Sequence, residues 1–104
     1  MFLAKAIKHR PSEPLTKPLY LALVFYFKRP KSHYRTGRYK HLLKDKAPEY
    51  HTTKPDIDNL VKFVADSLNK VFYEDDSQVV ELLAKKVYCD NNESARTDIV
   101  LDEY

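Results

Sequence analysis

The spacing of apolar and polar residues predicts one buried strand early in the chain. Residues 19–27 (LYLALVFYF) are apolar at nearly every position, and so short and closely apolar a run is typical of a central strand rather than a surface helix. Side chains two apart in a strand point the same way, so one face is expected to carry Leu19, Leu21, Leu23, Phe25 and Phe27.

A helical period follows in the second half of the chain. Pro55 keeps Lys54 out of the helical conformation, and Asp56 or Asp58 can cap a helix that continues to Asn69. Its expected buried stripe, with Phe63 beside it, is Leu60, Val64, Leu68 and Val71. Residues Leu3–Arg10 predict a second, short helix, which ends at Pro11.

Two later segments alternate as strands do. Residues 78–88 and 96–101 predict strands, and the polar residues 90–93 predict the turn that pairs them into a hairpin. Residues 28–53 show little periodicity, which favours a mobile binding loop, because long structureless loops are uncommon without a function. The fold class predicted for residues 1–104 is one α+β domain of two layers, a mixed or antiparallel sheet with helices on one side.

The composition is that of a globular protein without a membrane-spanning segment. The chain has 104 residues, 43% hydrophobic and 32% charged, which fits one globular domain, and no apolar run approaches the roughly 20 residues that cross a bilayer. The N-terminus lacks the separate basic and apolar regions of a secretory signal, so a cytoplasmic location is expected. Cys89 is the only cysteine, which excludes an intrachain disulfide, and we interpret it as a strand-end residue.

The charge is divided along the chain. Residues 28–54 contain nine Lys or Arg and two Asp or Glu, a net charge of +7, whereas residues 55–104 contain five and twelve, a net charge of −7. A polyanion is the expected partner of the basic loop, residues 28–54, and Tyr34 and Tyr39 can stack on exposed bases. A solvated surface loop is the alternative. The DNA-binding candidates in this loop are Lys28, Arg29, Lys31, Arg35, Arg38, Lys40 and Lys54.

Acidic residues flank the predicted helix on both sides. Asp56 and Asp58 precede it, and the pair Asp75 and Asp76 follows it. If the fold brings them together, their mutual repulsion requires a cation, and carboxylate oxygens select a hard one such as Mg²⁺. Ordinary helix capping and a polar turn are the alternative explanations of the two pairs.

The geometry of a helix limits how these acids can cooperate. Positions two apart in a helix point nearly opposite ways, so Asp56 and Asp58 converge only if the helix begins at Asp58 or later. About 12 helical residues span roughly 18 Å, so the chain must double back for Asp75 and Asp76 to reach the first pair. Lys62, four residues after Asp58, is expected on the same side, where it can offset carboxylate charge or meet a phosphate.

The histidines give no comparable signal. Their spacing matches no metal-ligand pattern, and we interpret all four as loop residues rather than ligands or bases: His9, His33, His41 and His51.

These acidic and basic motifs carry a family resemblance. Lys54-Pro-Asp-Ile-Asp-Asn-Leu-Val-Lys62, Asp66-Ser-Leu-Asn69, Tyr73-Glu-Asp-Asp-Ser-Gln-Val79 and Lys86-Val-Tyr88 resemble the signature of the RusA family of Holliday junction resolvases. The resemblance implies a Mg²⁺-dependent endodeoxyribonuclease, with Mn²⁺ able to substitute, that acts as a homodimer. Such an enzyme makes paired symmetric cuts in a four-way DNA junction during recombination and repair, and its genes are common in phages and prophages.

The resemblance also assigns residues. It implies that Asp56, Asp58 and Asp76 are the catalytic aspartates that hold metal, that Asp75 is the neighbouring acid and that Lys62 is the functional lysine. The family's lysine on the following strand falls on Lys86, which is expected to bind DNA with the basic loop. Family members resemble one another in having a basic, proline-containing strand before the first helix, and this chain is expected to lack it.

Two rival functions stay open. A catalytically idle module could bind branched or single-stranded DNA through the basic loop, with the acids holding a structural ion. A structure-specific nuclease of broader range could cut flaps or replication forks with the same chemistry. A junction cleavage assay separates the first rival from the resolvase, and competition between junction and linear duplex separates the second.

Overall fold

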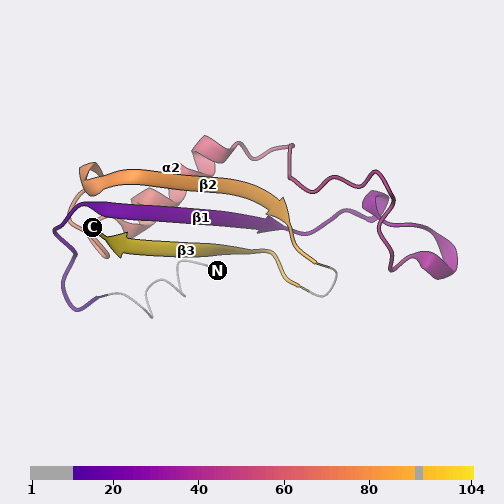
Figure 1. Ribbon diagram of the computed structural model, residues 1–104, viewed down its shortest axis with the longest axis horizontal. Coiled ribbons are helices and arrows are strands. Elements are labelled where there is room, and N and C mark those ends of the chain that lie inside the picture. Colours follow the sequence, from indigo (N-terminus) through magenta and orange to yellow (C-terminus); the bar gives the residue numbers. More distant parts are fainter. Residues whose placement is uncertain (1–10, 91–92) are drawn as a thin grey trace.

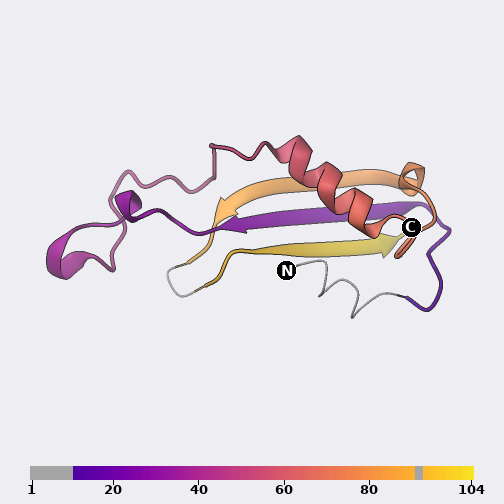
Figure 2. The ribbon, with the colours of Figure 1, turned by 180° about the vertical axis from the view of Figure 1, so that it is seen from behind.

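The computed structural model describes residues 11–90 and 93–104 (Figure 1). Three strands form one sheet in the order β2-β1-β3, namely β1 (Leu19–Phe27), β2 (Val79–Tyr88) and β3 (Arg96–Glu103). Strand β1 runs parallel to β2 and antiparallel to β3, and helix α2 (Ile57–Leu68) lies across one face of the sheet (Figure 2). The α+β prediction, with a mixed sheet and a helix on one side, is therefore confirmed. The helix predicted at Leu3–Arg10 lies outside the described residues.

Strand β1 is central, as its apolar run predicts. Its inward side chains are almost completely buried, with Leu19 and Leu23 at 0%, Leu21 at 1% and Phe25 at 4% exposure. They pack with residues of α2 and of the following turn in one hydrophobic core. Because strand side chains alternate, the intervening residues of β1 face the opposite side of the sheet.

The predicted hairpin of β2 and β3 is wrong. Both strands exist, but β1 lies between them, and Leu21 is in register with Leu82 on one side and Leu101 on the other. The physical reason is burial: the most apolar strand gains most from neighbours on both edges. A parallel β1–β2 pair then needs a long crossover connection, which residues 28–78 provide.

Helix α2 follows the predicted stripe closely. Val64 and Leu68 are 1% exposed, and Leu60 packs against the same core, whereas Phe63 is 59% exposed. The helix ends at Leu68, one residue earlier than predicted, and Val71 lies beyond it in the turn. Tyr73, which the periodicity did not identify, is completely buried in the core.

The basic loop forms an arm that projects past the end of the sheet, and the molecule measures 54 × 23 × 21 Å (Figure 1). It is less irregular than its lack of periodicity suggests. It contains two 3₁₀ turns, at Lys31–His33 and Gly37–Tyr39, and an antiparallel bridge between Tyr34 and Leu43. We call residues 28–54 the basic arm. No helix among the described residues is long and apolar enough to cross a membrane.

Candidate active site

Asp56 and Asp58 line one open pocket of about 500 Å³ at the start of α2. The pocket is bounded by the return of the basic arm at residues 50–53 and by the second half of β2 at residues 84–86. The return runs beside β2, because Tyr50 forms an antiparallel bridge with Val87. The two predicted aspartates therefore share a cavity with the root of the arm.

The start of α2 leaves both carboxylates exposed. The helix begins at Ile57, one residue earlier than convergence of the two aspartates was expected to require, and Asp56 keeps an extended backbone just outside it. Asp56 occupies the capping position but makes no capping hydrogen bond; it forms a 3.1 Å ion pair with Lys54 instead. Capping therefore does not explain the Asp56 side chain. The positive end of the helix dipole favours negative charge here.

Lys86 ties the loop before these aspartates to the sheet. Its ammonium donates hydrogen bonds to the carbonyl oxygens of Thr53 at 2.6 Å and Pro55 at 2.5 Å. The backbone N–H of His51 donates to the carbonyl oxygen of Lys86 at 3.2 Å. The predicted DNA-binding lysine thus has partners within the chain, directly beside Asp56.

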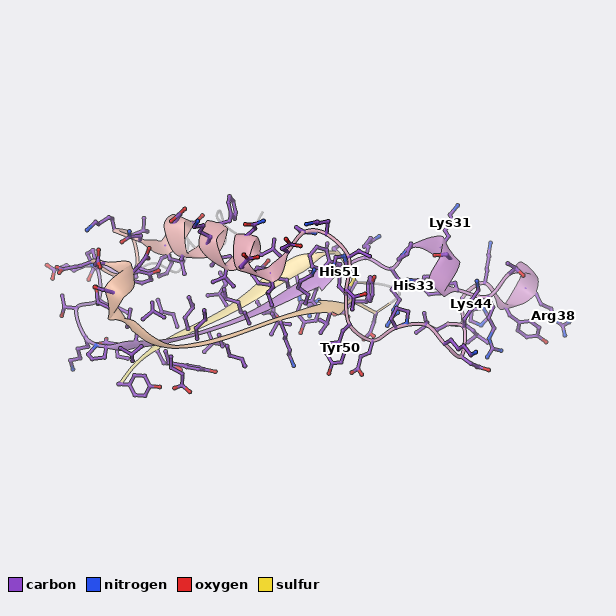
Figure 3. All side chains as sticks on the ribbon, turned by 90° about the horizontal axis from the view of Figure 1, so that it is seen from above. Lys31, His33, Arg38, Lys44, Tyr50 and His51 are labelled. Carbon is purple, nitrogen blue, oxygen red and sulfur yellow. The ribbon has the colours of Figure 1, made fainter. Side chains whose placement is uncertain are left out.

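An aromatic cluster supports the same loop. The His51 ring stacks on Phe27 with centroids 3.8 Å apart, and Tyr88 lies against both His51 and His33. Figure 3 shows His51 and Tyr50 where the arm joins the sheet. Burial, assisted by the charge of Lys86, lowers the pKa of His51, and its Nδ1 is buried without a hydrogen-bond partner. His51 therefore lies in this cluster as a neutral ring at neutral pH.

Asp75 and Asp76 lie beyond the other end of α2. The Asp75 side chain accepts from the Ser77 N–H and forms a capping box with Gln78, and the bonds from Ser77 lower the pKa of Asp75. A polar turn thus accounts for the Asp75 side chain. Asp76 accepts a 2.9 Å hydrogen bond from the hydroxyl of buried Tyr73, which also lies 3.3 Å from the carbonyl oxygen of Ala65.

The structure does not gather the predicted metal ligands into one cluster. Asp58 and Ala65 are seven helical residues apart, a rise of about 10 Å, so Asp76 beside Ala65 is distant from the first pair. In residues 11–90 and 93–104, no group of three or more His, Cys, Asp or Glu side chains could hold a metal ion. Lys62 is exposed one turn after Asp58, on the helix face between the two acidic groups.

The predicted DNA-binding residues fall into two groups. Five of them have partners within the chain: Arg29 with the Pro48 carbonyl, Arg35 with Asp45, Arg38 with the Tyr39 hydroxyl, Lys54 with Asp56, and Lys86 with Thr53 and Pro55. The other three, Lys28, Lys31 and Lys40, are exposed along the arm, where Figure 3 labels Lys31. Sequence reasoning missed the roles of Thr53, Tyr73 and His51 as neighbours of the acids. The only signal in the sequence for these roles is that each of the three residues lies within a few positions of one of the aspartates.

Comparisons with known proteins agree with the motifs and the fold. A family model for the endodeoxyribonuclease RusA matches residues 2–101. The chain is 39% identical over 98 residues to the uncharacterized protein YqaN of Bacillus subtilis (strain 168), a match covering 94% of this chain and 66% of that protein. It is 34% identical over 105 residues to the crossover junction endodeoxyribonuclease rusA of Lactococcus phage r1t, covering 96% and 67% respectively. No solved structure matches the chain.

An α+β domain with two aspartates and a basic arm around one pocket is consistent with a nuclease class of protein. The chain belongs to the RusA endodeoxyribonuclease family. It spans about two thirds of the length of the two relatives named above.

Proposed function

We propose that this protein is a metal-dependent endodeoxyribonuclease of the cytoplasm that resolves four-way DNA junctions by paired symmetric incisions. The observation that carries the proposal is the pocket in which Asp56 and Asp58 meet the root of the basic arm. Membership of the RusA family supports the reaction class, and the name of the phage relative supports the junction as substrate. The proposed enzyme is a homodimer, because paired cuts in a two-fold symmetric junction match one active site per subunit.

The residues at the pocket fit a divalent metal. Asp56 and Asp58 supply hard oxygen donors, and Mg²⁺ is often held by one or two carboxylates together with substrate phosphates. Bound Mg²⁺, or Mn²⁺ in its place, would activate a water molecule and offset charge on the phosphate and leaving oxygen. Asp76, with Asp75 beside it, stays in the proposed catalytic set on the strength of the family motif, and needs its own test.

The remaining residues have proposed roles that follow from their positions. Lys62, exposed on the face of α2 after Asp58, offsets negative charge on the attacked phosphate. The exposed cations of the arm neutralise flanking phosphates, so binding should weaken steeply as salt rises. Lys54 balances the charge of Asp56 until substrate binds, since their ion pair is largely exposed and therefore weak.

A junction cleavage assay tests the proposal. End-labelled synthetic four-way junction is incubated with the protein and Mg²⁺, and symmetric nicks are expected that EDTA abolishes. Asp58→Asn should reduce cleavage at least about 100-fold while junction binding persists, because the change removes a metal-binding charge and keeps the shape. Glu74→Gln, a change at an exposed acid outside the pocket, is the matched control and should cut normally.

Each rival function has its own outcome in this assay. Junction retention without nicks under any divalent metal would identify a binding module. Equal cutting of flaps, forks and junctions, with linear duplex competing as well as junction, would identify a broader nuclease. Normal cutting by Asp58→Asn would show that the pocket of Asp56 and Asp58 is not the active site.

A further inference from the structure

The tip of the basic arm combines positive charge with exposed apolar side chains. Tyr39, Leu42 and Leu43 are 46%, 40% and 39% exposed, and Arg38 and Lys40 lie among them. Figure 3 shows Arg38 at the end of the arm furthest from the sheet. Phosphate binding needs cations and gains nothing from exposed leucines and a tyrosine ring. The apolar side chains of the tip therefore indicate a second kind of contact besides phosphate binding.

Contacts within the arm hold this tip in shape. The Arg35 N–H donates to the Leu42 carbonyl at 2.8 Å, and the Arg35 guanidinium donates to the Leu43 carbonyl and pairs with Asp45. Gly37 turns the chain with a φ of 66°, a conformation that other residues rarely adopt. A pre-formed tip loses less conformational entropy on binding than a flexible loop does.

The Tyr39 ring is itself oriented by its neighbour. The Arg38 guanidinium lies 4.9 Å from the centre of the Tyr39 ring and donates to the Tyr39 hydroxyl at 2.7 Å. The guanidinium and the ring therefore form one cationic, aromatic unit at the tip. Nucleic-acid bases stack on aromatic rings and on guanidinium planes, and exposed apolar side chains act as wedges between base steps.

The charge and position of the arm select the partner. Its net charge of +7 favours a polyanion, and its return segment lines the pocket of Asp56 and Asp58, so a ligand along the arm continues into the proposed active site. A linear duplex buries the faces of its bases by stacking. At the branch point of an open four-way junction that stacking is interrupted, so base faces are available.

We propose that the arm tip binds the branch point of a DNA junction, with Tyr39 stacking on an exposed base pair and Leu42 packing beside it. This inference rests on the proposed function, because it names the part of the junction that the arm reads. The cations of the arm then supply affinity for any DNA, and Tyr39 supplies the preference for branched DNA.

Binding measurements without cleavage test the inference. The full chain carrying Asp58→Asn, in EDTA, is titrated with a fixed four-way junction and with a linear duplex of equal length. Adding Tyr39→Ala should weaken junction binding about 5- to 100-fold, the range expected for one lost stack, and leave duplex binding and the salt dependence unchanged. Tyr39→Phe should restore the preference. Tyr104→Ala, at a 64% exposed tyrosine outside the arm, is the matched control.

A fluorescent base reports the contact directly. 2-Aminopurine at the branch point should change its emission on binding the parent protein, and this change should be absent with Tyr39→Ala and present with Tyr104→Ala. Lys40→Ala should instead weaken junction and duplex alike and lower the salt slope by about one.

Three results would overturn the inference. Equal loss for junction and duplex with Tyr39→Ala would make the tyrosine a general DNA contact, and an unchanged preference would remove it from recognition. A change of sedimentation without a change of DNA preference would make the tip a contact between protein copies. Failure of the wild type to cut junctions would defeat the proposed function, whereas normal cutting with unaltered selectivity in Tyr39→Ala would defeat this inference alone.

Discussion

The Lys86 ammonium group binds the protein's own backbone. Two carbonyl acceptors, of Thr53 and Pro55, fix the loop that leads into Asp56. We expect Lys86→Met to lower the cleavage rate at least about tenfold by releasing this loop, with junction affinity and its salt slope unchanged. Lys86→Arg should restore part of the rate. Gel-shift titrations over a salt series, beside single-turnover cleavage, measure both quantities; a salt slope lower by about one would instead make Lys86 a phosphate contact.

His33 and His51 make stability depend on pH. Burial, with Arg29 beside His33 and Lys86 beside His51, lowers both pKa values below 6.5. At a pH between the folded and unfolded pKa values, the unfolded chain binds more protons than the folded chain. The free energy of unfolding is therefore highest, as far as these histidines contribute, above pH 6.5, and it decreases as the pH falls below that value.

Thermal melts across this range should therefore show a Tm that decreases on acidification. His51→Phe, which keeps a ring to stack on Phe27, combined with His33→Gln, should flatten the decrease. The carboxylates with lowered pKa values, Asp75 and Glu93, act in a separate window at lower pH and serve as an internal control. An unaltered pH dependence in the double variant would contradict the assignment.

At the scale of elements, Tyr73 connects helix α2 to the acidic turn. Its buried hydroxyl donates to Asp76, and burial and this carboxylate raise the pKa of Tyr73. Tyr73→Phe should destabilise the protein by about 1 kcal/mol, the usual net value of one such hydrogen bond, measured by urea denaturation. Asp76→Asn should cost a similar amount. If Asp76 also acts in catalysis, Asp76→Asn will lower the cleavage rate as strongly as Asp58→Asn does, whereas Tyr73→Phe will not. If Asp76→Asn and Tyr73→Phe have equal, small effects on cleavage, the role of Asp76 is structural.

The elements also show what a sequence can and cannot predict. The strand at Leu19–Phe27 and the helix at Ile57–Leu68 were predictable because one-sided burial leaves a period in the sequence. Strand order was not predictable, because apolar spacing tells which face is buried and not which edge is shared. The capping box of Asp75 is local and fits the polar turn, whereas the contact of Lys86 with Pro55 depends on the folded sheet and that of Tyr73 with Ala65 on how the turn folds back on α2.

At the scale of the molecule, the sheet face away from α2 exposes a small apolar patch between charged residues such as Lys85 and Asp102. Leu83 and Val100 are in register with Ala22 on that face and are 52% and 49% exposed. We expect this face to join two copies of the protein, because burying its apolar patch would be favourable and a two-fold dimer matches the proposed paired cuts. Sedimentation velocity should give a dimer, and Val100→Lys should raise its Kd at least about tenfold by burying a charge. Tyr39→Ala, on the arm, should remain dimeric. A wild type that sediments as a monomer, or a Val100→Lys variant that dimerises normally, would exclude this face as the interface.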